Sequence, residues 1–135
     1  MRRLFVDCDR CLLDSRAHDL WLTLKEKYAT TEEALDAYAK ECPDDLVLNI
    51  ALLLQILQFK ANGYTIVLWT DRGERQIDVT MKNLSMWGIV KIFDMFIFGD
   101  GKKKQYPIGP DDYVMDDMWS NLEDVNNPIF IPAFG

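Results

Sequence analysis

The sequence contains few residues of the types that build disulfide or zinc frameworks. Its three cysteines are Cys8, Cys11 and Cys42, and its one histidine is His18. An odd number of cysteines does not suit the disulfide framework of a small secreted domain. A structural zinc site needs about four ligands, and Cys42 and His18 lie far along the chain from the Cys8–Cys11 pair. We therefore expect neither framework.

Long apolar runs and excess positive charge are also missing. No stretch approaches the roughly 18 apolar residues that indicate a membrane span. At the start of the chain, Asp7 and Asp9 interrupt the apolar residues of MRRLFVDCDR, so we expect no signal peptide and a cytoplasmic location. The net charge of −7 disfavours extended contact with nucleic acid or an anionic membrane. A small phosphorylated substrate stays compatible, because it needs only a local positive site.

The residues that are present indicate one α/β domain. The chain has 135 residues, and 49% of them are hydrophobic, which is enough for a single core. Short β-rich runs alternate with helical patterns, which favours a mainly parallel sheet of about five strands in a Rossmann-like three-layer sandwich, with helices on both faces. The strands are expected at residues 4–6, 65–69, 93–98, 113–115 and 128–131. The helices are expected at 15–27, from 31, at 46–61 and at 74–87, and the apolar 46–61 helix is expected to be deeply buried.

The first two predicted helices form an insert in this domain. They occupy roughly residues 15–43 and follow the first strand directly. The core then consists of about 1–14 and 44–135, within a single domain of 1–135. The insert contains about 30 residues, so we expect a small helical cap that leaves an open mouth.

Charged and hydroxyl side chains follow three of the predicted strands. Asp7 and Asp9 follow the first, Thr70 and Arg72 follow the second, and Asp116 begins an acidic pair with Asp117 after the fourth. In parallel sheets, ligands bind outside the carboxyl ends of the strands. Close carboxylates repel each other unless a cation lies between them, and Mg²⁺ suits carboxylate ligands. The pattern predicts a Mg²⁺ site at this edge.

A thiol site is the alternative interpretation of the same stretch. Cys8 and Cys11 form a Cys-x-x-Cys motif, but Asp7 and Asp9 flank Cys8. Negative neighbours raise a thiol pKa, whereas redox cysteines need a lowered one. We expect both cysteines to be buried fillers.

The strand-end motifs resemble those of the haloacid dehalogenase-like (HAD) superfamily of phosphatases. The first motif is FVDCDRCL at residues 5–12, with Arg10 where glycine is common and Cys11 where threonine is usual. The second is IVLWT, ending at Thr70, and the fourth is YVMDD, ending at Asp117. The third is a single lysine, for which we favour Lys104 or Lys103, although Lys102 lies at a similar spacing. The segment FIFGDG, with Asp100, is a rival fourth motif that we interpret as a loop.

The resemblance implies a Mg²⁺-dependent phosphomonoesterase that acts through an aspartyl-phosphate. Asp7 would be the nucleophile, and an aspartate of ordinary pKa is ionised at neutral pH. Mg²⁺ would be held by Asp7, the backbone carbonyl of Asp9, Asp116 and Asp117. Asp9 would act as general acid and then as general base, which requires a raised pKa. Thr70 and the motif lysine would bind the phosphoryl oxygens.

The substrate is less defined by the sequence. The segment from Thr70 to Arg72 loosely resembles the Thr-x-Arg segment of polynucleotide 3′-phosphatase domains and small nucleotidases. Arg72 is thus a candidate phosphate ligand, or else forms a salt bridge to a neighbouring acid. Trp21, Tyr28 and Tyr38 are candidates for stacking on a base, although ordinary helix packing explains them as well. We expect a nucleotide or another small phosphoester, with a polynucleotide 3′-end or a non-catalytic, receiver-like phosphate-binding module as alternatives.

Overall fold

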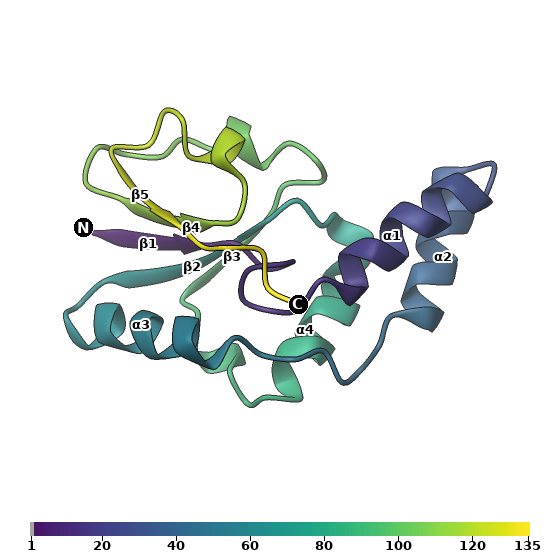
Figure 1. Cartoon of the computed structure of the whole chain (residues 1–135), viewed down its shortest axis with the longest axis horizontal. Helices are drawn as coiled ribbons and strands as arrows, with labels where there is room; N and C mark the ends of the chain where they lie inside the picture. The colour runs from purple at the N-terminus through teal and green to yellow at the C-terminus, as the bar shows by residue number, and fades with distance from the viewer. Residues whose placement is uncertain (1) are drawn as a thin grey trace.

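A computed structural model of the chain describes residues 2–135 and contains one parallel sheet. The five strands have the order β3-β2-β1-β4-β5, and all neighbouring strands are parallel. The expected α/β fold with a parallel sheet is confirmed (Figure 1). The strands are β1 (Arg3–Val6), β2 (Thr65–Thr70), β3 (Met95–Phe98), β4 (Tyr113–Asp116) and β5 (Asn127–Phe130).

Alternation along the strands divides the core into two parts. Successive side chains of a strand point to opposite faces, so Leu4 and Val6 of β1 join one cluster while Phe5 joins the other. The larger cluster lies under α3 (Ile50–Ala61) and α4 (Ile77–Ser85). The smaller cluster lies on the opposite face, where loops cover the sheet.

Those loops replace the long helices expected on the second face. In Figure 1 they arch over β4 and β5, on the side of the sheet away from α3. They contain short 3₁₀ turns at Lys103–Gln105 and Trp119–Asn121. Leu122 is buried in this cluster, and Tyr106, Ile108 and Val125 pack against it. Because these apolar side chains already cover the sheet, the smaller cluster is closed without a long helix.

Helix α3 differs from its prediction in both start and burial. It begins at Ile50 instead of residue 46, because the Asn49 side chain accepts a hydrogen bond from Leu52 N and caps the helix. The preceding residues run extended, and Leu48 forms a bridge with Leu13. The expectation of deep burial was wrong: Ile50 and Leu54 are 52% and 58% exposed.

Two other elements also differ from their predicted boundaries. The segment predicted as one helix at 74–87 starts with a 3₁₀ turn at Glu74–Gln76, and α4 ends at Ser85. The side chain of Gln76 accepts a hydrogen bond from Gly73 N, which favours the tight first turn. Strand β3 begins at Met95 because a 3₁₀ turn occupies Val90–Ile92.

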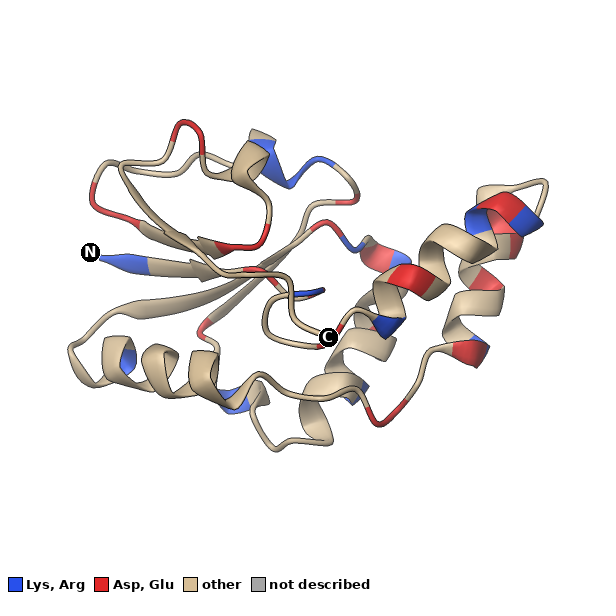
Figure 2. Ribbon diagram, viewed as in Figure 1, with Lys and Arg blue, Asp and Glu red and all other residues tan. Residues whose placement is uncertain are grey.

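Helices α1 (Arg16–Lys27) and α2 (Thr31–Glu41) form a hairpin beside the carboxyl ends of the strands (Figure 1). Thr30 caps α2 by accepting a hydrogen bond from Glu33 N. Trp21 and Tyr38 pack edge to face between the helices, with ring centroids 5.9 Å apart. Figure 2 shows charges of both signs along the hairpin, as expected for a solvated surface. No helix within residues 2–135 has the length and apolar character needed to cross a bilayer.

A partly buried ion pair joins β1 to the loop before β4. Arg3 donates two hydrogen bonds to Asp112, of 3.1 Å and 2.6 Å, and Asp112 also accepts from Gly109 N. Burial alone would raise the pKa of Asp112, but the hydrogen bonds from Arg3 and Gly109 lower it below its ordinary value. The charged form of Asp112 therefore stabilises the fold.

We predict that Asp112→Asn lowers the free energy of unfolding by about 1 to 3 kcal/mol at pH 7, since it removes charge-assisted hydrogen bonds. The folded pKa is depressed, so this stabilisation is present above the unfolded pKa of about 3.9 and is lost as the pH falls through the folded value. Urea unfolding of both proteins at pH 7 and at pH 3.5 measures the difference.

The control is Asp44→Asn, which removes the exposed Lys82–Asp44 pair. Exposed pairs contribute less than about 1 kcal/mol, so we expect a small change. Equal losses for both variants, or a loss for Asp112→Asn that does not shrink in acid, would contradict the role of this pair.

Candidate active site

Three carboxylates from separate parts of the chain meet at the carboxyl edge of the sheet. Asp7 follows β1, Asp116 ends β4, and Asp117 comes directly after it. One carboxylate oxygen from each lies within 4.8 Å of the other two. Asp116 is fully buried and Asp7 nearly so. The acidic cluster expected at this edge is therefore present, and its oxygens are hard ligands of the type that Mg²⁺ prefers.

Lys103 supplies positive charge to this cluster. Its Nζ donates to Asp7 Oδ1 at 2.8 Å, to Asp116 Oδ2 at 2.7 Å and to the carbonyl of Trp69 at 3.2 Å. The Lys103 side chain is only 2% exposed. All three donors of the ammonium group are thus directed at the carboxyl ends of three adjacent strands, β1, β2 and β4.

The loop after β3 holds Lys103 in this position. Lys103 N donates to Asp71 Oδ1 at 3.0 Å, and Gly99 N donates to the carbonyl of Thr70 at 2.8 Å. A Cβ atom at Gly99 would lie 2.6 Å from the backbone of Lys103, so this close approach requires glycine. Lys104 is exposed and lines a separate hollow beside Tyr106. Of the two lysines that we favoured, the structure brings Lys103 to the acidic cluster and leaves Lys104 outside it; Lys102 is exposed as well.

Burial changes the electrostatics of the nucleophile candidate. Desolvation raises the pKa of Asp7 well above its ordinary value, and Asp116 adds to this while Lys103 opposes it. The sequence-based assumption of an ordinary pKa for Asp7 was therefore wrong. Burial alone would lower the pKa of Lys103, but Asp7 and Asp116 together raise it, so the lysine stays charged. A second positive charge beside Asp7 would favour its ionised form.

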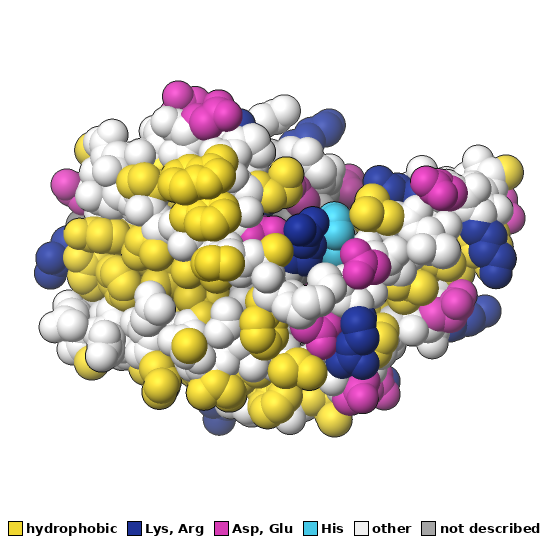
Figure 3. All heavy atoms as spheres, in the orientation of Figure 1, with side chains coloured by type: hydrophobic (Ala, Val, Ile, Leu, Met, Phe, Trp, Pro, Cys, Tyr) yellow, Lys and Arg dark blue, Asp and Glu magenta, His cyan; other side chains and the backbone are white. Residues whose placement is uncertain are grey.

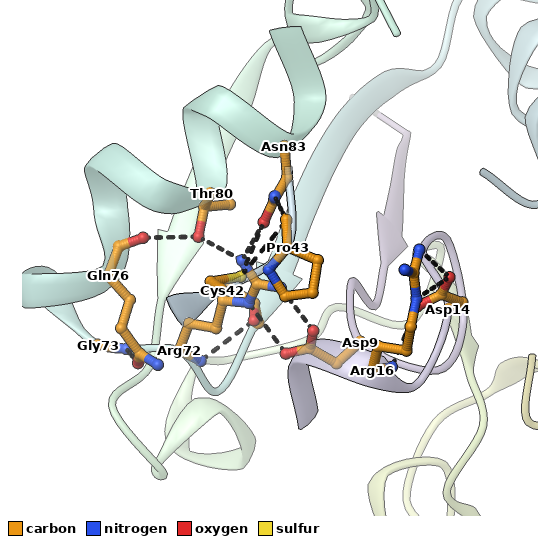
Figure 4. A network of polar contacts seen from close by, with 11 residues as sticks. Asp9, Asp14, Arg16, Cys42, Pro43, Arg72, Gly73, Gln76, Thr80 and Asn83 are labelled. Carbon is orange, nitrogen blue, oxygen red and sulfur yellow. Dashed lines mark hydrogen bonds and ion pairs between the residues drawn. The ribbon is translucent and has the colours of Figure 1, made fainter. Parts of the chain in front are cut away.

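Asp9 is paired with Arg72 instead of being directed at the carboxylate cluster. The guanidinium donates from Nη2 to Asp9 Oδ1 at 2.6 Å and from Nε to Asp9 Oδ2 at 3.0 Å. Its Nη1 donates to Thr80 and Asn83 on α4, at 2.9 Å and 3.1 Å (Figure 4). The Arg72 side chain is 2% exposed. Of our two interpretations of Arg72, the structure shows the salt bridge.

This pairing determines the protonation of Asp9. Burial by itself would raise the pKa of Asp9, but the charge and hydrogen bonds of Arg72 bring it below the ordinary value. The raised pKa that a general acid at this position needs is therefore not found, because a bidentate cation outweighs desolvation. The arrangement favours the carboxylate form of Asp9.

A small cavity lies against the cluster, and we call it the reaction cavity. Its volume is about 70 Å³. Thr70 lies in its wall, and its Oγ1 accepts a hydrogen bond from Arg72 N at 3.1 Å, which leaves the hydroxyl proton free to donate. The other lining residues include Asp7, Asp9, Arg10, His18, Lys103 and Asp117. Figure 3 shows acidic and basic side chains and a histidine side chain around the hollow between the main body and the hairpin.

A larger cavity adjoins the first beneath the hairpin, and we call it the hairpin cavity. Its volume is about 340 Å³. The two cavities share Asp9, His18 and Asp71 in their walls. Apolar side chains of the hairpin, among them Trp21, Leu22 and Leu35, line one part of it, and polar residues that include Lys25, Arg72 and Asp100 line the rest. A ligand with its phosphate in the reaction cavity could therefore place an organic group in the hairpin cavity.

The two cysteines of the first motif are fully buried. Burial raises the pKa of the Cys8 thiol to about 12 and that of Cys11 well above its ordinary value. Redox cysteines need lowered pKa values and access. Both side chains belong to the hydrophobic core, as expected.

Several residues of the site were missed or given no role by the sequence. Asn121 donates from Nδ2 to Asp116 Oδ2 at 3.2 Å, and Asp71 positions the backbone of Lys103. Arg10 and His18 line the reaction cavity. A charged residue in place of a motif glycine was the available signal for Arg10, but Asn121 carried no local signal, since its position depends on the 3₁₀ turn after β4. Asp100 lies in a loop, as we interpreted it, and lines the hairpin cavity.

Comparison by sequence finds no match: no protein-family model and no curated protein is similar to the chain at a significant level. Comparison of structures does find similar folds. A HAD-superfamily hydrolase from Ehrlichia chaffeensis has a TM-score of 0.59 at 12% identity, over 94% of this chain and 84% of that one. A β-phosphoglucomutase, so described provisionally, from Thermotoga maritima has a TM-score of 0.57 at 16% identity, over 91% and 79% of the two chains.

A third similar structure belongs to the Pnkp1/Rnl/Hen1 RNA repair complex. Its TM-score is 0.60 at 15% identity, and the match covers 96% of this chain but only 42% of that one. At these identities the comparisons establish the fold. The fold expected from the resemblance is confirmed: this chain has the fold of the HAD-superfamily hydrolases.

Proposed function

We propose that the protein is a Mg²⁺-dependent phosphomonoesterase that forms an aspartyl-phosphate on Asp7. The observation that carries the proposal is the buried cluster of Asp7, Asp116 and Asp117 with Lys103 bound between two of its members. A nucleophile, a set of cation ligands and a donor for phosphoryl oxygens thereby lie at one small cavity. This combination is what phosphoryl transfer requires.

The carboxylate cluster fits a divalent cation. Asp7, Asp116 and Asp117, together with the backbone carbonyl of Asp9, would hold Mg²⁺, which takes hard oxygen ligands and keeps some of its waters. When bound, the cation would neutralise charge on the phosphoryl oxygens and on Asp7. The three carboxylates carry more negative charge than Lys103 alone offsets, which is why a second cation fits here.

Side chains of this protein would carry out the two steps of the reaction. A carboxylate oxygen of Asp7 attacks phosphorus, the bond to the ester oxygen breaks, and the leaving oxygen takes up a proton from Asp9, or from water where Asp9 is ionised. Water next attacks the phosphorus of the aspartyl-phosphate, which releases inorganic phosphate and restores Asp7. The Thr70 hydroxyl donates to the phosphoryl oxygens as charge moves in line, and the Lys103 ammonium group would join it by exchanging one of its present acceptors for a phosphoryl oxygen.

Asp9 suits the second of these steps best. As a carboxylate paired with Arg72, it is ready to accept a proton from the attacking water. To protonate the leaving alcohol in the first step, Asp9 must first gain a proton against the effect of Arg72. Esters of acidic alcohols, which leave without this help, should therefore react fastest.

The hairpin cavity favours a small phosphoester with an organic group, and we propose a nucleotide. About 340 Å³ of space, with both apolar and polar side chains in its walls, accommodates a base and sugar. Trp21 and Tyr38 both line the cavity, but Tyr38 is only 1% exposed and packs against Trp21, so Trp21 is the candidate for stacking. We place the protein in the reducing cytoplasm, in keeping with its free cysteines.

A polynucleotide end is the second candidate substrate. The likeness to a chain of an RNA repair complex and the Thr70–Arg72 segment favour it. The net charge of −7 disfavours an extended nucleic-acid track, so only a short strand end would be bound. A panel that contains deoxynucleoside monophosphates and 3′-phosphorylated oligonucleotides distinguishes the two candidates by kcat/KM.

We predict that Asp7→Asn lowers kcat for p-nitrophenyl phosphate by roughly a thousandfold or more, because an amide cannot form the covalent intermediate. Asp44→Asn, at an exposed site, is the matched control and should retain full activity. Circular dichroism verifies that both variants are folded. Turnover by folded Asp7→Asn at the wild-type rate would contradict the nucleophile assignment.

The two lysines offer a paired test. Lys103→Met should remove most activity, whereas Lys104→Met should retain it. Lys103→Met leaves two buried carboxylates without their cation, which costs several kcal/mol of stability. We therefore expect Mg²⁺ to raise the melting temperature of Lys103→Met more than that of the wild type. Equal activity losses for both variants, or a melting temperature of Lys103→Met that Mg²⁺ does not change, would contradict the assignment.

The hairpin cavity is tested by Trp21→Ala. Loss of a stacking surface should raise KM for a deoxynucleoside monophosphate by about tenfold. Acetyl phosphate, whose organic part is too small to fill the hairpin cavity, should be hydrolysed by both proteins with similar kcat/KM. Unchanged KM for the nucleotide would show that its base does not use this cavity.

A further inference from the structure

Arg10 adopts a backbone conformation that an arginine rarely has. Its φ is 61°, and Asp100 is the other non-glycine residue with positive φ in the described part of the chain. A residue with a Cβ atom meets steric resistance in this region, whereas glycine does not. The carbonyl of Arg10 accepts a hydrogen bond from Phe134 N at 2.8 Å, which holds the turn in place. Such strain often occurs at functional sites.

The guanidinium of Arg10 lines the reaction cavity but is only loosely held there. Its nearest charged partner is Asp117, with Nε 3.6 Å from Oδ2, which is too long for a hydrogen bond. Within residues 2–135, no hydrogen bond from the Arg10 side chain is present, and this side chain is 40% exposed. Its donors are therefore available to a ligand.

The other fixed cations of the site are already engaged. Lys103 donates hydrogen bonds to Asp7 and Asp116. The guanidinium of Arg72 donates hydrogen bonds to Asp9 and to two residues of α4. Among the lysines and arginines in the described wall of the reaction cavity, Arg10 alone has a head group that donates no hydrogen bond. A phosphate dianion that enters among several carboxylates needs such a group.

The reaction cavity is so small that a phosphoryl group bound in it lies near Arg10. In a space of about 70 Å³, a phosphoryl group beside Asp7 also lies against the other walls. A guanidinium presents paired donors that match two phosphate oxygens. A divalent cation at the carboxylate cluster would also take up the charge of Asp117 and so weaken its attraction for Arg10.

We infer that Arg10 binds the phosphoryl group of the substrate and exchanges its weak contact with Asp117 for phosphate oxygens. This inference rests on the proposed function, because it concerns the same cavity. It explains why the chain keeps an arginine where the backbone favours glycine. Arg10 thus acts on substrate affinity, while Asp7 carries the chemistry.

The test uses Arg10→Gly and Arg10→Lys in the full-length chain. Calorimetry with inorganic phosphate in saturating Mg²⁺ should show binding about tenfold to a hundredfold weaker for Arg10→Gly. Arg10→Lys keeps one charge without the paired donors and should be intermediate. KM for p-nitrophenyl phosphate should rise in parallel, with a smaller change in kcat. The melting temperature of Arg10→Gly should not fall, because glycine relieves the strained φ.

Arg2→Ala is the matched control, since it removes the same charge at the opposite edge of the sheet, where Arg2 contacts Tyr64. It should leave phosphate affinity unchanged. Wild-type affinity and KM in folded Arg10→Gly, or an equal loss in Arg2→Ala, would overturn the inference. If Arg10→Gly weakens phosphate binding but the wild type hydrolyses no ester, the proposed function fails and the binding role of Arg10 stands. If the wild type is active and Arg10→Gly matches it, only the role of Arg10 fails.

Discussion

The contact of one lysine with two buried carboxylates is the interaction on which the site depends. Burying a charge costs several kcal/mol unless it is paired and hydrogen-bonded. Asp7 and Asp116 lie side by side with little access to water, and Lys103 donates to both. Without this ammonium group the carboxyl ends of β1 and β4 would repel each other. With it, the cluster still holds unbalanced negative charge, which makes it a suitable site for a divalent cation.

Two separate charge networks give the site its chemical asymmetry. Lys103, in the loop after β3, donates hydrogen bonds to Asp7 and Asp116. Arg72, in the loop after β2, donates hydrogen bonds to Asp9. The pKa of Asp7 is therefore raised despite Lys103, so that a second cation would favour its ionised form, whereas the pKa of Asp9 is already lowered by Arg72. Arg72 is in turn fixed by Thr80 and Asn83 on α4, so the position of Asp9 depends on the packing of that helix against the sheet.

Much of this arrangement could be predicted from the sequence because it depends on short-range patterns. The apolar runs that end in Asp7, Thr70 and Asp116 indicated parallel strands, and parallel strands bring their carboxyl ends to one edge. The choice between Lys103 and Lys104 could not be made in this way, because it depends on a 3₁₀ turn and on the close approach of Gly99 to Lys103.

The sequence was also misleading where tertiary context reversed a local effect. The general-acid role implied by the family resemblance required a raised pKa for Asp9, but a bidentate arginine 63 positions away lowers it. The Leu- and Ile-rich segment at 46–61 suggested deep burial, but α3 lies at the surface, where one of its faces meets solvent. In both cases the outcome depended on the tertiary arrangement, which no local sequence pattern encodes.

The central claim is that Asp7, Asp116 and Asp117 share a divalent cation next to Lys103. Crystals grown with Mn²⁺ test it most directly, because anomalous scattering locates the ion independently of the chain. The account predicts an anomalous peak with oxygens of Asp7 and Asp116 at about 2.2 Å, typical of hard divalent cations bound by carboxylates. An anomalous peak only at other sites, with Lys103 still bridging Asp7 and Asp116 and no ion bound to either carboxylate, would contradict it.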